Sequence, residues 1–438
     1  MRDLLVAAIV FGSLPFILKR PFWGILMLAW LGYMNPHRLC YGFMYSMPSV
    51  FIVTIVTLIG MLASREAKRM IWSREIVLLV ILVIWMGLTT SQAFHTDQAI
   101  VEYEKVLKIQ ILTVMTLLML TTRDKVNLFI WIIALSLGFY GVKGGIFTII
   151  HGGVYHVWGP AGSFIAGNNE LALALVMTIP LMRYLQLQEK HRFIKLGLLV
   201  AMLLTAISAV GSQSRGALIA LVITGAFFWL KSRNKLFIGI FIALTVIVAA
   251  NLMPAAWYQR MDTIGTYDQD ASAIGRLNAW SAYYHMANDR FMGGGFHAWG
   301  HDTFALYAPD PTNVRDVHSI YFQMLGEHGY FGFALFLALL ILTWLKCGTI
   351  IRAAKRNPDF GWARDLAAMI QVSIPAYMSA GAFLGLAYFD YIYHLIAVVV
   401  VLHQLVVVDG STNRIPVSSG SNNLEPNPKL KTAVGIRA

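Results

Sequence analysis

Long apolar runs separated by short polar segments dominate the chain. None of them shows the two-residue alternation that a transmembrane β-barrel requires, so we expect every run to be a helix. At roughly 20 apolar residues per span, the pattern predicts an all-α polytopic membrane protein with about 12 transmembrane helices. The runs lie at about 4–18, 22–36, 48–64, 76–93, 104–121, 126–150, 168–186, 194–211, 216–231, 236–252, 328–348, 366–386 and 391–408.

The first two apolar runs are short for membrane spans. Residues 1–36 therefore fit either two short spans or a re-entrant hairpin, and the total is 12–13 spans. We expect residues 1–409 to form the transmembrane domain, with residues 253–327 inserted in it as one large extra-membrane loop. Residues 410–438 are rich in Ser, Asn and Pro without an apolar pattern, which predicts a disordered tail.

Composition supports the membrane assignment. Hydrophobic residues make up 58% of the chain and charged residues 13%, against about 45–50% and about 25% in soluble domains. These values argue against a soluble enzyme and against a disordered protein. In a membrane protein, a net charge of +12 mostly reflects the Lys and Arg residues that set its orientation in the bilayer. We therefore expect membrane lipids as partners and no nucleic acid.

The basic residues gather in five short loops that alternate with sparse or acidic ones. Because Lys and Arg favour the cytoplasmic side, these loops and the C-terminal tail are predicted to be cytoplasmic, and the 253–327 loop external. We expect the Gly275–Asp289 stretch of that loop to be an amphipathic helix. The basic residues are Arg65, Lys68, Arg69 and Arg74; Arg123 and Lys125; Lys190, Arg192 and Lys195; Lys231, Arg233 and Lys235; and Lys346, Arg352, Lys355, Arg356 and Arg364.

Two arginines on the external face are candidates for binding an anion. Arg215 lies in a tight turn between two apolar runs, and Arg276 opens the predicted external helix. A guanidinium can grip a phosphate through two hydrogen bonds, and a helix N-terminus favours an anion. The alternatives are an Arg215 side chain that reaches the lipid headgroups and an Arg276 side chain that is simply solvated.

His318, just before the run at 328–348, is a candidate general base. A neutral imidazole accepts a proton near neutral pH, although with 12 histidines in the chain a structural role is the alternative. Glu327 lies nine residues further on. We expect it to face the same side as His318 without touching it, as a partner for an arginine or as a structural group.

Other polar residues beside the spans are weaker candidates. Asn168 and Asn169 open a span, where an Asn commonly caps the helix. Asp390 is a lone acid between two runs, and Arg290 and Arg315 are reserve candidates for the site. Asp268 and Asp270 have the DxD form that binds a divalent cation in many glycosyltransferases, but two close Asp residues also occur by chance. We expect no metal site, and His297 and His301 lack the helical context of a zinc site.

Several of these residues lie in short motifs that resemble the conserved block of the O-antigen ligase and polymerase superfamily. The motifs are Gly162-Ser-Phe-x3-Asn-Asn-Glu170, Ser214-Arg-Gly-Ala217, Gly275-Arg-x3-Trp280 and His318-Ser-x-Tyr-x3-Leu-x-Glu-x-Gly-x2-Gly332. Together they cover roughly residues 160–345. The first 150 residues are similar to O-glycosylation ligases associated with exosortase systems.

The resemblance, which is strongest to ligases of the WaaL type, implies a bundle similar to GT-C glycosyltransferases in the bacterial inner membrane, with a periplasmic active site. Such an enzyme transfers a glycan from undecaprenyl diphosphate to a sugar of lipid A–core, inverting the anomeric centre without a metal or cofactor. By position, His318 would be the base, and Arg215 and Arg276 would hold the diphosphate. No obligate protein partner is expected.

Three other functions remain open. An O-antigen polymerase and a protein O-oligosaccharyltransferase share the same motifs and differ in the acceptor. A transporter of lipid-linked glycans belongs to a different class. Ion-coupled transporters often carry charged residues at mid-span, whereas here the unusual polar residues gather at one face.

Overall fold

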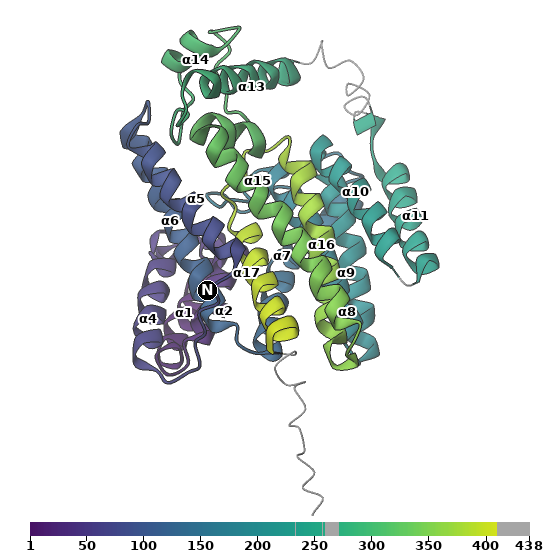
Figure 1. Cartoon of the computed structure of the whole chain (residues 1–438). Helices are drawn as coiled ribbons and strands as arrows, with labels where there is room; N and C mark the ends of the chain where they lie inside the picture. The colour runs from purple at the N-terminus through teal and green to yellow at the C-terminus, as the bar shows by residue number, and fades with distance from the viewer. Residues whose placement is uncertain (233, 256, 259–270, 410–438) are drawn as a thin grey trace, which may run out of the picture.

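The computed structural model describes residues 1–232, 234–255, 257–258 and 271–409, and all regular structure in these ranges is helical. Each of the predicted apolar runs falls on a helix, which confirms the all-α class (Figure 1). The helices of the runs are α1 (Arg2–Lys19), α2 (Phe22–Tyr33), α4 (Ser49–Ala63), α5 (Arg74–Thr90), α6 (Thr96–Met119), α7 (Arg123–Ile150), α8 (Asn168–Gln188), α9 (Arg192–Gly211), α10 (Arg215–Lys231), α11 (Lys235–Leu252), α15 (Ile320–Ala354), α16 (Gly361–Gly381) and α17 (Asp390–His403).

Among the described residues, five segments are long and apolar enough to cross a membrane on those grounds alone. They are α7, α8, α9, α15, and α17 together with the π-helical turn η4 (Gln404–Val408) that continues it. The helices α2 and α4 and the first part of α11 are apolar but shorter. These findings support a multi-pass membrane protein, and the count of about 12 spans stays a prediction.

The predicted cytoplasmic loops lie together at one end of the bundle. Side chains in or next to these loops contact one another through ion pairs, hydrogen bonds and cation–π contacts. These contacts place the loops together. They join Lys125 to Glu66 (2.8 Å), Arg123 to Trp362 (5.5 Å to the ring centroid), Gln188 to Asp365 (3.1 Å), Arg183 to Phe237 (4.7 Å to the ring centroid) and Lys346 to Glu75. The grouping of basic loops expected from the sequence is therefore present in the fold.

The N-terminal hairpin of α1 and α2 is tied to the rest of the chain at both of its ends. At one end, the Asp3 carboxylate accepts hydrogen bonds from the backbone N–H groups of Gly42 (3.0 Å) and Met44 (3.2 Å). At the other end, the turn between α1 and α2 approaches the basic loops, where the Phe22 N–H donates to Glu66 (3.2 Å). With 12 residues in α2, the hairpin is shorter than the long helices of the bundle.

Two further helices, α13 (Ala271–Asp289) and α14 (His301–Tyr307), lie across the end opposite the basic loops (Figure 1). They are fastened to α15, which is broken at Gly329 by a backbone φ of 66°. The kink leaves the carbonyl groups of Gly326 and Glu327 open, and the N–H groups of Gly294 (2.7 Å) and Gly295 (2.9 Å) donate to them. This pairing satisfies polar groups that a helix break would otherwise leave exposed in an apolar region.

Candidate active site

Arg215 is the first residue of α10 and is positioned by a tight, well-bonded turn. Ser214 caps the helix, because its hydroxyl accepts from the Ala217 N–H at 3.2 Å. Gln213 has the left-handed φ of 57°, which is unfavourable for a residue with a side chain. Its side-chain amide compensates by donating to the carbonyls of Gly153 (3.0 Å) and Val154 (3.2 Å). The turn therefore fixes where the Arg215 side chain leaves the backbone.

Arg276 comes from α13 and lines the same cavity as Arg215. This cavity has a volume of ≈ 40 Å³, and Phe383 and Leu384 close one side of it. The residues that line it are Asn169, Gln213, Ser214, Arg215, Gly216, Ser272, Arg276, Phe383 and Leu384. The two arginines named by the sequence motifs thus meet in space although they belong to different helices.

The expected position of Arg276 at a helix N-terminus is wrong. The described part of the helix already includes Ala271, so Arg276 lies beyond the first turn, where the unpaired N–H groups of a helix end are no longer available. The helix N-terminus at this cavity belongs to α10 and Arg215 instead. Guanidinium groups beside the positive end of a helix favour an anion such as a phosphate. The present volume admits one small anionic group.

His318 lies beside an acid that the sequence reasoning missed. Asp316 Oδ2 is 3.7 Å from His318 Nδ1, and both side chains are more than 40% exposed (44% and 43%). The segment between Asn313 and Ser319 carries no regular secondary structure. Asp316 and His318 are two residues apart, and the spacing Asp-x-His was therefore the available signal.

The α13 helix holds the His318 segment through Trp280. The indole N–H of Trp280 donates to the Val317 carbonyl at 2.8 Å, and its ring stacks on Phe322 with centroids 5.0 Å apart. The same indole lies 6.2 Å from the ring of Phe383, which closes the arginine cavity. Trp280 therefore contacts both the segment that carries the histidine and the cavity that holds the arginines.

The loop between α16 and α17 brings the two parts of the site close together. A Cβ atom placed on Gly385 would lie 3.4 Å from Asp316 Oδ2 and 3.9 Å from His318 Cα. The preceding residues of the same loop, Phe383 and Leu384, line the arginine cavity. The loop therefore passes within van der Waals reach of both Asp316 and His318.

Glu327 belongs to a buried hydrogen-bond network beneath this loop. Its carboxylate accepts from the Tyr388 hydroxyl (2.5 Å) and from the His297 N–H (3.3 Å). The Tyr388 oxygen also lies 2.7 Å from His328 Nε2, and His328 Nδ1 lies 2.7 Å from the Thr89 hydroxyl of α5. Of the two expected roles, the contacts favour the structural one.

The remaining supporting candidates divide between the site and its surroundings. Asn169 lines the cavity. Asn168 does not cap α8, because Gly167 is the cap residue and the Asn168 amide donates instead to the Ser212 carbonyl at 2.8 Å. This bond ties α8 to the turn that carries Arg215. The cap expectation is therefore wrong for Asn168.

Arg315 approaches the site, whereas Arg290 and Asp390 do not. The Arg315 guanidinium packs against Gly275, where a Cβ atom would lie 2.6 Å from its Nε, and it donates to Asn313 at 2.9 Å. Arg290 donates to the Gln92 carbonyl at 2.5 Å. Asp390 opens α17 and lies against α2, with its carboxylate 3.5 Å from a Cβ atom placed on Gly32.

Asp268 and Asp270 lie outside the described residues. Within the described ranges, no three or more His, Cys, Asp or Glu side chains gather in a way that would hold a metal ion. A transfer assay with EDTA tests whether the reaction needs a metal.

These elements are consistent with a multi-pass helical membrane protein that has a small cavity lined by two arginines, and a histidine, near one end of its bundle. Residues 200–337, which include both cavity arginines and His318, match the family described as O-Antigen ligase. This match supports membership of the O-antigen ligase and polymerase superfamily and confirms the resemblance seen in the motifs. Members are glycosyltransferase-like enzymes that act on lipid-linked glycans in a membrane.

The N-terminal part of the chain has a separate match. Residues 1–190 match a family of unknown function (DUF5935). No curated protein matches the chain.

Proposed function

We propose that this protein is an O-antigen ligase of the bacterial inner membrane. It transfers a glycan from undecaprenyl diphosphate to a sugar hydroxyl of lipid A–core at the periplasmic face, without a metal or cofactor. The observation that carries the proposal is the shared cavity of Arg215 and Arg276 at the start of α10, close to the loop that abuts His318.

An apolar groove below Arg215 fits the lipid part of the donor. It has a volume of ≈ 650 Å³ and lies between α9, α10 and α11. Val210 and Leu218 belong to it, and Leu218 is three residues after Arg215 on α10. A polyprenyl chain in this groove would place its diphosphate at the arginine cavity. A lipid-linked donor therefore suits both sites together.

The chemistry follows from the residues. His318 removes the proton of the acceptor hydroxyl, and that oxygen forms a bond to the anomeric carbon. The bond from this carbon to the diphosphate breaks, and its electron pair leaves with the undecaprenyl diphosphate. Arg215 and Arg276 stabilise the developing negative charge. Asp316, near Nδ1 of His318, favours the tautomer with a proton on Nδ1 and the lone pair on Nε2.

The distribution of basic residues supports one orientation of the protein in the membrane. The five basic loops share one end of the bundle, and the positive-inside rule assigns that end to the cytoplasm. The arginine cavity and His318 lie toward the other end, beneath α13. The site would then face the periplasm, where no ATP is present and cleavage of the donor's bond between the sugar and the diphosphate drives transfer.

An assay of product identity tests the proposal. Purified protein is mixed with undecaprenyl diphosphate-linked glycan and lipid A–core in the presence of EDTA. We expect a core-linked glycan. Elongation of the lipid-linked glycan alone would support a polymerase instead. Transfer to a Ser or Thr peptide, with none to core, would support a protein O-oligosaccharyltransferase. EDTA inhibition reversed by Mg²⁺ or Mn²⁺ would instead indicate that Asp268 and Asp270 bind a cation that holds the diphosphate.

A further inference from the structure

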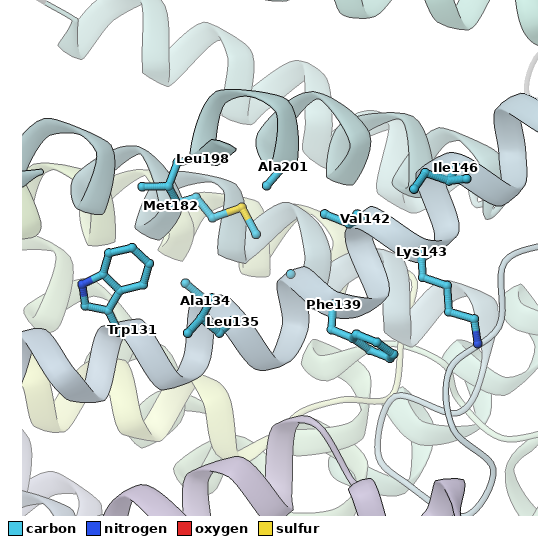
Figure 2. Close-up of a pocket in the computed structure, with 11 residues that line it drawn as sticks. Trp131, Ala134, Leu135, Phe139, Val142, Lys143, Ile146, Met182, Leu198 and Ala201 are labelled. Atoms are coloured by element: carbon cyan, nitrogen blue, oxygen red, sulfur yellow. The ribbon is translucent and has the colours of Figure 1, made fainter. Parts of the chain in front are cut away.

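A second apolar groove, remote in sequence from the site residues, runs along α7 and opens to the outside of the bundle (Figure 2). Its volume is ≈ 540 Å³. Side chains of α7 line its length from Trp131 to Ile146, and Leu198 and Ala201 of α9 line its other wall. Met182 of α8 lies between them. The groove shares no lining residue with the arginine cavity.

The groove exists because α7 and α9 are in close contact only along part of their length. A Cβ atom placed on Gly141 would lie 2.2 Å from Thr205 Oγ1, and one on Gly145 would lie 2.2 Å from the Leu204 carbonyl oxygen. Small residues allow such close approach of membrane helices. A Cβ atom on Gly138 would meet only the Met182 side chain within 4 Å. The space left between the helices there is the groove.

Lys143 is the one charged residue that lines the groove. Its side chain is exposed and extends from α7 seven residues before the helix ends. In the described part of the chain no carboxylate forms an ion pair with it. An ammonium group on a membrane helix is costly unless it reaches the interface or meets an anion.

The dimensions fit one lipid chain. Trp131 and Lys143 lie at opposite ends of the groove as drawn in Figure 2. At a rise of 1.5 Å per residue, the twelve residue steps from Trp131 to Lys143 cover about 18 Å. One leaflet of a hydrocarbon core about 30 Å thick is about 15 Å deep. A chain in the groove would therefore end near Trp131 with its headgroup at Lys143.

We propose that this groove binds an acyl chain of an anionic phospholipid, with the lipid phosphate at the Lys143 ammonium. The apolar walls select a hydrocarbon chain, and the single cation selects a negative headgroup. The site is independent of the transfer reaction, since it is separate from Arg215, Arg276 and His318. Its occupancy would contribute to how the α7–α9 pair sits in the bilayer.

Quenching of Trp131 fluorescence by brominated lipids tests this site. The full chain is reconstituted in phosphatidylcholine vesicles that contain brominated phosphatidylglycerol or brominated phosphatidylcholine with the same chains. The Trp131 signal is the difference between the wild type and Trp131→Phe. We expect the phosphatidylglycerol to bind about fivefold more tightly, the factor expected from one lysine near an anionic headgroup.

Variants separate the cation from the groove. Lys143→Gln should abolish the preference for phosphatidylglycerol, whereas Lys108→Gln, a change of another exposed lysine, should retain it. Ala201→Phe should fill the groove and remove Trp131 quenching by both lipids. Equal quenching by the two lipids in the wild type, or a preference that survives in Lys143→Gln, would overturn the proposal.

Two other outcomes would also overturn the proposal. An absence of Trp131 quenching by either lipid, or quenching that persists in Ala201→Phe, would show that no chain enters the groove. Displacement of the brominated lipid by undecaprenyl phosphate at far lower concentration than by unlabelled phosphatidylglycerol would assign the groove to a prenyl lipid instead.

Discussion

His318 is held in an uncommon backbone conformation by its immediate neighbours. Its φ of 42° lies in the left-handed region, which costs a non-glycine residue about 1–3 kcal/mol unless the surroundings impose it. On one side of His318, the Trp280 indole donates to the Val317 carbonyl. On the other side, Ser319 is the N-cap residue of α15. The backbone of His318 is thereby held in place before any substrate binds, which suits a proposed general base.

Replacement of Asp316 by Asn tests whether the acid orients His318. We expect a fall in kcat of about tenfold with little change in KM for the donor, since a general base contributes about 10²–10⁴-fold in total. An exposed partner at 3.7 Å should supply only part of that factor. The measurement is steady-state transfer with purified protein.

Asp310→Asn provides the matched control for Asp316. Asp310 is an exposed acid in the same external segment, with Thr312 as its partner. A loss of kcat in Asp310→Asn as large as in Asp316→Asn would contradict a specific role for Asp316.

Some residues of the candidate site could be predicted because a polar or charged side chain is unusual beside an apolar run. Arg215 and His318 stand out beside apolar runs, and the motifs point to Arg276. Asp316 does not stand out in the same way, because it lies in a polar segment among other charged residues and away from the apolar runs. The contact of Gly385 with His318 was not predictable, because it depends on how α16 and α17 pack against α15.

At the scale of elements, helix α15 connects the helical bundle to α13 and α14 at one of its ends. Its kink at Gly329 allows Glu327 and His328 to face Tyr388 from the loop before α17, while Thr89 reaches the same network from α5. Buried polar groups are tolerated when each has a partner. The network therefore links α5 and α15 to the loop that lies against His318.

The Tyr388→Phe substitution tests the network. It removes the hydroxyl between Glu327 and His328 and leaves both buried without this partner, at a cost of about 1–3 kcal/mol. We expect a lower midpoint of thermal unfolding in detergent and weaker transfer. Tyr330→Phe is the control, because the exposed Tyr330 hydroxyl bonds only to Asn288. A midpoint equal to that of Tyr330→Phe would contradict the proposed importance of the network.

The pattern of apolar residues predicted where the helices lie. It did not predict the full extent of α13 or the kink in α15. Residues 271–274 were not part of the predicted helix, although their sequence Ala-Ser-Ala-Ile is compatible with helix and the structure includes them in α13. Gly275 lies inside this helix, where the Arg315 side chain occupies the space that a Cβ atom would take. The break at Gly329 likewise depends on contacts with Phe291 and the 293–295 segment.

At the scale of the whole molecule, the two ends of the bundle differ in chemistry. One end gathers the basic loops, and the other carries α13, α14 and the site (Figure 1). The alternation of charge along the sequence was sufficient to predict this division. The number of spans was not, because α2, α4 and the first part of α11 are shorter than a membrane crossing needs, and their placement depends on neighbouring helices.

The most direct test of the account is the single-turnover rate of glycan transfer to lipid A–core in EDTA, compared among His318→Ala, Arg215→Ala and the wild type. His301→Ala is the matched control, since His301 is an exposed histidine of the same external region. We predict a loss of at least about 10²-fold for His318→Ala, a comparable loss for Arg215→Ala, and a wild-type rate for His301→Ala. Wild-type transfer by folded His318→Ala protein would contradict the central claim.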